Sequence, residues 1–266
     1  MNNKNLTVPF TIIDAFSEGP FQGNPAAVCL LEAWLDDDTL QRMANQHQLS
    51  ETAFIVKREK DFHLRWFTPT SEVKLCGHAT LAAAYTLYRQ VGIESIKFHT
   101  LSGELDVTVT EHNVVMTFPI IEPHCLEDST SFTEGFDKTP QEAWLSSQDL
   151  LLVFNHESDI INLTPSLTFI KKLPYRGVIC TAPSQKNTID FISRYFAPAV
   201  GVDEDPVTGS AHCILASYWS QRLNQKKLQA YQASQRGGYV SCEVISNERI
   251  LLSGKGRQYA EGKLYL

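Results

Sequence analysis

The sequence has no long hydrophobic run and no excess of positive charge. No segment approaches the roughly 20 apolar residues that cross a bilayer, and the start "MNNKNLTVPFTIIDAF" has no basic stretch followed by an uninterrupted apolar one. Lys and Arg number 23 against 30 Asp and Glu, which gives a formal net charge of −7. Phosphate binding needs clustered Lys and Arg, and no such run occurs. We therefore expect a soluble cytoplasmic protein that binds neither membrane nor nucleic acid.

The common cofactor and metal motifs are also missing. There is no CxxC pair, no HExxH, no GxxxxGK[ST] and no GxGxxG after a strand, and the eight His residues show no ligand spacing. The six cysteines are scattered in a chain too long to need disulfides, so most should be buried thiols. These absences predict neither a metal nor a nucleotide cofactor and leave small molecules as the expected ligands.

An internal duplication is the main feature that is present. The block "RWFTPTSEVKLCGHATLAAAYTLY" from Arg65 resembles "RYFAPAVGVDEDPVTGSAHCILASYWSQRL" from Arg194, since both run from Arg-aromatic-Phe-x-Pro through an acidic loop to a Gly-led run of small and apolar residues. After each block, at Thr100 and at Ala233, a Gly precedes two alternating segments joined at an Asn turn. Two blocks in the same order indicate two related halves.

The halves should share one architecture. "HATLAAAYTLY" and "SAHCILASYWS" are apolar or small around nearly the whole helical wheel, as in helices buried on all sides. We expect an α+β fold of two pseudo-symmetric halves, 1–118 and 119–266, each a mostly antiparallel or mixed sheet or barrel wrapped around its helix. The weakly patterned region Ile121–Trp144 is interpreted as their connection, and the final strand either stays in the second half or crosses back to the first. The acidic start "LDDDTLQRMANQ" predicts an outer helix over Asp37–Gln46.

Both buried helices begin at a small-residue turn. These turns are "CGH" at Cys76–His78 and "TGS" at Thr208–Ser210, and the first N–H groups of each helix need acceptors. If the helix starts converge, they offer a site for a substrate carboxylate. Alternatively, Gly77 and Gly209 only ease tight strand-to-helix turns.

Four further side chains are candidates for chemistry, each with a structural alternative. Glu51 in "LSETAF" is a proton carrier, a solvated residue or a capping partner of Ser50 or Thr52. His78 is a proton-transfer or binding group or a polar cap. Asp205 in "EDPVTGSA" orients an imidazole, binds an ammonium or complements the helix dipole. Cys76 is a base whose thiolate the helix N-terminus favours, or a buried thiol.

Four ordered blocks resemble those of the phenazine biosynthesis-like family of PhzF. They span nearly the whole chain: "FQGNPAAV" from Phe21, "LSETAF", "RWFTPTSEVKLCGHATLAAA" and "GVDEDPVTGSA". The resemblance implies a diaminopimelate epimerase-like fold, an active site between two similar halves, no cofactor and a homodimer. It places Glu51 on the catalytic glutamate of the family, and it places Gly77, His78, Asp205 and Ser210 on other active-site positions.

The activity implied by the resemblance is isomerisation by proton transfer. In the enzyme that names the family, the glutamate moves a proton between two ring carbons of trans-2,3-dihydro-3-hydroxyanthranilate. Here the substrate would be a small amino-carboxylate, with Ser210 and the helix ends, including Thr208 and Gly209, holding the carboxylate. His78 and Asp205 would assist proton movement and amine binding.

Two other functions stay open. Epimerases and racemases of this fold use a Cys at the place of Cys76 and a second at the place of Thr208, and this chain has only the first. A Cys76-based amino-acid epimerase, racemase or dehydratase is one alternative. A metabolite-binding or protein-interaction role without turnover is the other.

Overall fold

The computed structural model of the protein describes residues 6–111 and 113–266, which divide into two compact units. Unit 1 extends to Thr117 and also includes Ser253–Leu266, whereas unit 2 is Phe118–Leu252. In the described ranges, no helix combines the length and the apolar character needed to cross a membrane. All six cysteines are free thiols, and all except Cys125 are buried, in agreement with the sequence prediction.

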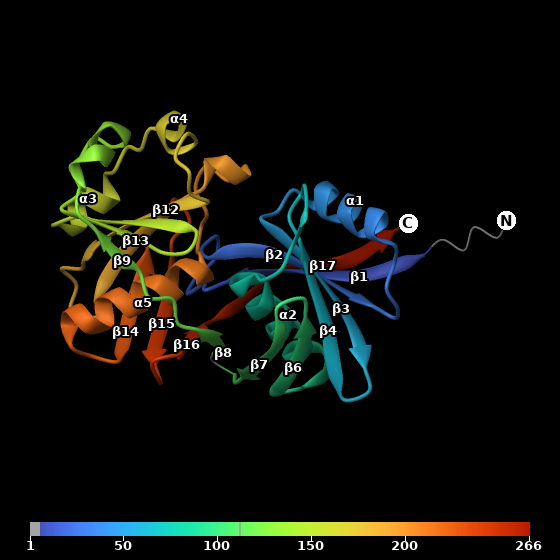
Figure 1. Cartoon of the computed structure of the whole chain (residues 1–266). Coiled ribbons are helices and arrows are strands. Elements are labelled where there is room, and N and C mark those ends of the chain that lie inside the picture. The colour runs from blue at the N-terminus through green and yellow to red at the C-terminus, as the bar shows by residue number, and fades with distance from the viewer. Residues whose placement is uncertain (1–5, 112) are drawn as a thin grey trace. The chain divides into compact units, whose positions relative to one another are not determined.

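Unit 1 is built on a mixed sheet with one helix on each side. Its elements are β1 (Thr7–Ala15), β2 (Asn24–Leu31), α1 (Asp37–His47), β3 (Glu51–Arg58), β4 (Asp61–Phe67), β5 (Glu72–Val73), α2 (Gly77–Val91), β6 (Ser95–Thr100), β7 (Gly103–Val109), β8 (Val114–Pro119) and β17 (Gly256–Tyr265). The buried α2 packs on β1, β2, β3 and β7 (Figure 1). The amphipathic α1 covers another part of the sheet, where its Leu40 and Met43 join a cluster with Phe54 and Phe67.

Local sequence explains how both helices start and stop. Asp36 caps α1 because its Oδ1 accepts a hydrogen bond from the Thr39 N–H at 2.9 Å, as the acidic start predicts. Helix α2 ends at Gly92, which has a φ of 71° and donates its N–H to the Tyr88 carbonyl at 2.9 Å. Nine of the α2 side chains, nearly all small or apolar, are buried, so the sheet must cover more than one face of this helix.

The last strand of the chain completes the sheet of unit 1. β17 pairs antiparallel with β1, for example Ala260 with Ile12, and β1 pairs antiparallel with β2. Of the two places that the sequence left open for this strand, the structure therefore has the return to the first unit.

Unit 2 has the same plan. Its elements are β9 (His124–Leu126), the 3-10 helix η1 (Thr130–Gly135), β10 (Glu142–Leu145), β11 (Asp149–Val153), α3 (Glu157–Ile161), α4 (Leu167–Ile170), β12 (Gly177–Pro183), β13 (Phe191–Phe196), η2 (Pro198–Val200), α5 (Gly209–Leu223), β14 (Lys227–Gln232), β15 (Gly238–Val244) and β16 (Arg249–Gly254). The buried helix α5 packs on β14 and β15 (Figure 1).

The strand pairings repeat from one unit to the other. Along β17-β1-β2-β3-β4-β6-β7 they are antiparallel, antiparallel, parallel, antiparallel, parallel and antiparallel. Along β9-β10-β11-β12-β13-β14-β15 the pattern is the same. The predicted α+β fold, with two related halves that each surround a buried helix, is confirmed.

Ile121–Trp144, interpreted from sequence as the connection between the halves, is instead part of unit 2. This region contains β9, η1 and most of β10, and its Phe132, Phe136 and Ala143 are buried in the main core cluster of unit 2. The sequence pattern is weak because these elements are short and irregular, so few residues show a period of 2 or 3.6.

Candidate functional site

Glu51 begins strand β3, immediately after the turn that follows α1. Gln48 takes the left-handed conformation at the end of α1, with a φ of 52°, and lets the chain turn into the sheet. β3 then pairs parallel with β2, which sets Glu51 opposite Ala26. Thr52, one of the two proposed capping partners of Glu51, instead lies 2.9 Å from the Nδ1 of His47 through its hydroxyl. Glu51 is partly buried, with 17% of its side chain exposed.

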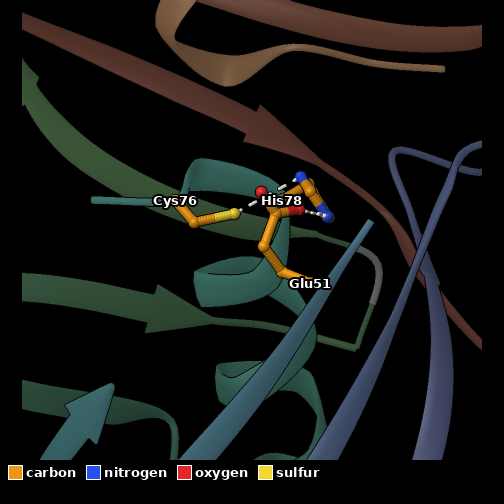
Figure 2. A group of neighbouring side chains, drawn as sticks. All are labelled: Glu51, Cys76 and His78. Atoms are coloured by element: carbon orange, nitrogen blue, oxygen red, sulfur yellow. Dashed lines mark hydrogen bonds and ion pairs between the residues drawn. The ribbon is translucent and has the colours of Figure 1, made fainter. Parts of the chain in front are cut away.

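Glu51, His78 and Cys76 form a chain of side chains in unit 1. An Oε2 of Glu51 lies 3.1 Å from His78 Nε2, and the other ring nitrogen, Nδ1, lies 3.5 Å from Cys76 Sγ. Figure 2 shows the imidazole linked to both neighbours. Cys76 is the residue before α2, and Gly77 and His78 are its first two residues, so the start of this helix carries two members of the group.

Asn24 is a fourth member that the sequence reasoning did not single out. Its Nδ2 lies 3.3 Å from His78 Nδ1, and the residue is completely buried at the start of β2. Gly23 before it has a φ of 76°, and a Cβ there would overlap the carbonyl oxygen of Ala15. The "GNP" signature thus has a physical role, because the glycine allows the close turn that places the amide against the imidazole. The sequence signal that could have identified Asn24 was its place in the block "FQGNPAAV".

The surroundings of His78 decide its charge. Burial opposes protonation, but the charge of Cys76, which the sulfur carries only as a thiolate, and then that of Glu51 outweigh it and raise the pKa of His78 well above its ordinary value. Burial, and secondly the charge of Glu51, raise the pKa of Cys76 to about 11. Near neutral pH the thiol therefore keeps its proton, and Glu51 is the partner whose negative charge supports an imidazolium.

The imidazole can change partners when it changes charge. A neutral ring accepts from the Asn24 amide at Nδ1 and carries its proton on Nε2, facing Glu51. A protonated ring has a hydrogen at Nδ1 as well, and the sulfur of Cys76 is within reach to accept it. Both forms have partners, so a proton can reside on this ring or on the carboxylate.

Glu51, Cys76 and His78 also form a possible metal-binding group. One ligand atom from each lies within 4.8 Å of the others. In their present arrangement, however, the carboxylate and the sulfur contact opposite nitrogens of the imidazole. A single ion would bind one of these nitrogens only, so the geometry matches a proton path better than a shared coordination sphere.

In unit 2, the turn before α5 gathers the other predicted residues. Thr208 precedes the helix, Gly209 and Ser210 begin it, and Thr208 Oγ1 donates to Asp205 Oδ2 at 2.5 Å. The acidic neighbour Glu204 has a different task, because it forms a two-pronged ion pair with Arg194 at 2.7 and 2.9 Å. Asp205 therefore belongs to the helix start, whereas Glu204 fixes the loop to strand β13.

Gln232 at the end of β14 holds this turn and was missed by the sequence reasoning. Its Nε2 donates to the Asp205 carbonyl at 2.7 Å, and its Oε1 accepts from the Thr208 N–H at 2.9 Å. The amide is completely buried, so both of its ends need protein partners. A lone Gln in an alternating strand gives no sequence signal for such a role.

The structure thus places the predicted residues in two groups, one in each unit. Glu51, Cys76, Gly77 and His78 lie together in unit 1, and the residues of the "EDPVTGS" turn lie together in unit 2. The convergence of the two helix starts on one cleft stays a prediction.

The comparisons with solved structures support the fold class. A hydroxyproline epimerase from Agrobacterium vitis shares the fold, with a TM-score of 0.64 over 100% of this chain and 94% of that one at 8% identity. A PhzF family protein from Enterococcus faecalis has a TM-score of 0.93 at 42% identity, covering 98% of this chain and 100% of that one.

The family follows from sequence. An uncharacterized isomerase of Pseudomonas aeruginosa is 48% identical over 256 residues, which are 96% of this chain and 97% of that one. A human phenazine biosynthesis-like domain-containing protein is 40% identical and covers 97% of this chain. The pattern of phenazine biosynthesis-like proteins matches residues 13–262. The chain belongs to the PhzF-type phenazine biosynthesis-like family.

Proposed function

We propose that the protein is an isomerase that moves a proton on a small amino-carboxylate without a cofactor, with Glu51 as general acid and base. The observation that carries this proposal is the contact of Glu51 with His78, 3.1 Å apart at the start of a buried helix. Relatives named as isomerases and a hydroxyproline epimerase of the same fold support the reaction class.

In the proposed mechanism, Glu51 removes a proton from a substrate carbon and returns it to another position. The nearby imidazolium of His78 stabilises the carboxylate before proton transfer. Its Nε2 hydrogen can also donate to the carboxylate and orient it, because the ring nitrogen and the carboxylate oxygen are within hydrogen-bond distance. In the neutral form of the ring, Asn24 donates to Nδ1 and orients it. In unit 2, Asp205 and the first residues of α5 would bind the polar groups of the substrate.

The alternative with Cys76 as base is less well supported. A thiol whose pKa is raised to about 11 holds its proton near pH 7, so it is a poor base, although it could donate a proton. Thr208, at the corresponding place in unit 2, has no thiol to complete a pair. Cys76 therefore fits better as a neighbour of His78.

Deuterium uptake from heavy water, followed by NMR, tests the proposal. The panel would contain trans-2,3-dihydro-3-hydroxyanthranilate, proline derivatives and common α-amino acids. With the compound that exchanges, Glu51→Gln should lower the exchange rate at least about 10³-fold, because the amide cannot carry the proton. The matched variant Cys76→Ser should keep most of the activity.

The opposite outcomes separate the candidate functions. Exchange that survives in Glu51→Gln and disappears in Cys76→Ser would transfer the role of base to the thiol. Ligand-dependent stabilisation without exchange across the whole panel would instead support the binding-protein function.

A further inference from the structure

Unit 2 contains a charged cluster at the start of β12 that has no counterpart among the predicted site residues. Arg176 lies immediately before β12, and its backbone N–H donates to the Gln148 carbonyl at 2.8 Å. Asp149, the first residue of the neighbouring parallel strand β11, is 1% exposed. A buried carboxylate at this depth needs strong partners.

Three hydrogen bonds fix the carboxylate of Asp149 and the guanidinium of Arg176. Asp149 Oδ1 accepts from Arg176 Nε at 3.0 Å and from the Tyr195 hydroxyl at 3.0 Å, while Arg176 Nη2 donates to Asp149 Oδ2. Such a two-pronged pair sets the plane of the guanidinium. Gly177 makes room for the hydrogen bond from Tyr195 to Asp149, because a Cβ there would overlap the Tyr195 hydroxyl.

The fixed guanidinium reaches the helix start. Arg176 Nη2 donates to Ser210 Oγ at 3.2 Å. Arginine has donors only, so the Ser210 oxygen must accept, and its own hydrogen is left to point elsewhere. A hydroxyl that accepts from a cation is also a stronger donor, since hydrogen bonds in a chain polarise one another.

We propose that Arg176, held by Asp149 and Tyr195, is a positioning residue that makes Ser210 a dedicated hydrogen-bond donor to the carboxylate of the substrate. The inference rests on the proposed function, in which the substrate is a small amino-carboxylate. It adds to that function a reason for carboxylate selectivity and a residue that controls it. Arg176 acts through the serine hydroxyl and does not touch the reacting atoms.

The test compares binding of anthranilate with binding of its neutral amide, anthranilamide, by isothermal titration calorimetry on the full chain. The wild-type protein should prefer the carboxylate by about tenfold or more, as expected for a charge-assisted hydrogen bond. Arg176→Gln and Ser210→Ala should each reduce the preference to about twofold. The double variant should equal Ser210→Ala, because both changes remove the same donor.

Matched variants separate positioning from stability. Arg65→Gln breaks a similar two-pronged pair with Glu72 in unit 1 and should leave the preference unchanged. Arg176→Lys keeps a positive charge beside Ser210 and should recover part of the preference, and it also serves as the test variant if Arg176→Gln does not fold.

Several results would overturn the inference. These are a wild-type protein that does not distinguish the two compounds, an undiminished preference in Arg176→Gln, or a further loss when Arg176→Gln is added to Ser210→Ala. Glu51→Gln distinguishes failure of the proposed function from failure of this inference. This variant should abolish proton exchange and leave the carboxylate preference intact.

Discussion

The two units share a framework and differ in chemistry. Arg65 binds Glu72 through two hydrogen bonds and lies over the Phe67 ring, 5.1 Å from its centre. Arg194 binds Glu204 in the same way and lies 4.9 Å from the centre of the Phe196 ring. In both units this arrangement holds the acidic loop in front of the buried helix.

The register identifies the corresponding positions at the candidate site. Phe54 pairs with Arg65, and Cys180 pairs with Arg194, so counting back along β3 and β12 places Gly177 in unit 2 where unit 1 has Glu51. By the same comparison, Ser210 corresponds to His78, and Thr208 to Cys76. Unit 1 thus has a carboxylate, an imidazole and a thiol, and unit 2 has an anchored arginine and a serine. The fold tolerates these differences because other residues form the Arg–Glu pairs that the two units share.

The largest expected effect comes from replacing a residue of unit 1 by its counterpart in unit 2. We expect His78→Ser, which installs the residue of unit 2, to lower deuterium exchange by about 100-fold or more, because the partner of Glu51 is lost. The parallel change Cys76→Thr should cost less than about tenfold. Equal losses in the two variants would mean that the thiol is as important as the imidazole.

A second exchange concerns His212, whose counterpart in α2 is Thr80. Each donates to the backbone carbonyl four residues earlier, His212 to Thr208 and Thr80 to Cys76. Burial lowers the pKa of His212 to about 4. Between the ordinary His pKa of about 6.5 and pH 4, only the unfolded chain takes up this proton. Lowering the pH across this range therefore lowers the free energy of unfolding by about 3 kcal/mol.

His212→Thr should remove this part of the acid sensitivity. The measurement is denaturant unfolding of both proteins between pH 7 and pH 4, with the two pH slopes compared so that other titrating groups cancel. Parallel slopes would show that the imidazole is already charged in the folded protein or takes its proton without cost.

The smallest expected effect is that of Gly177→Ala, at about 1 to 3 kcal/mol of unfolding free energy, because the added methyl group must displace Tyr195. In a Tyr195→Ala background the same change has space, and its cost should fall below about 1 kcal/mol. Chemical unfolding of the four proteins gives the cycle. If Gly177→Ala does not change the free energy of unfolding, contact with Tyr195 is not what excludes a side chain at this position in unit 2.

Several parts of the site could be predicted from sequence because they depend on neighbours along the chain. Cys76, Gly77 and His78 are consecutive, and their place at a helix start follows from the apolar run after them. The same holds for Thr208, Gly209 and Ser210. Asn24 and Gln232 could not be assigned in this way, because their partners lie in strands and helices distant in sequence.

By itself, the sequence determined the duplication, the buried helices, the outer helix and the absence of common cofactor motifs, because each is written in short-range periodicity and composition. Only the tertiary structure decided that Glu51 meets His78, that β17 joins β1, and that Arg176 reaches Ser210 in unit 2. The physical reason is that side-chain chemistry depends on distances of a few ångströms, and strand register across tens of residues sets those distances.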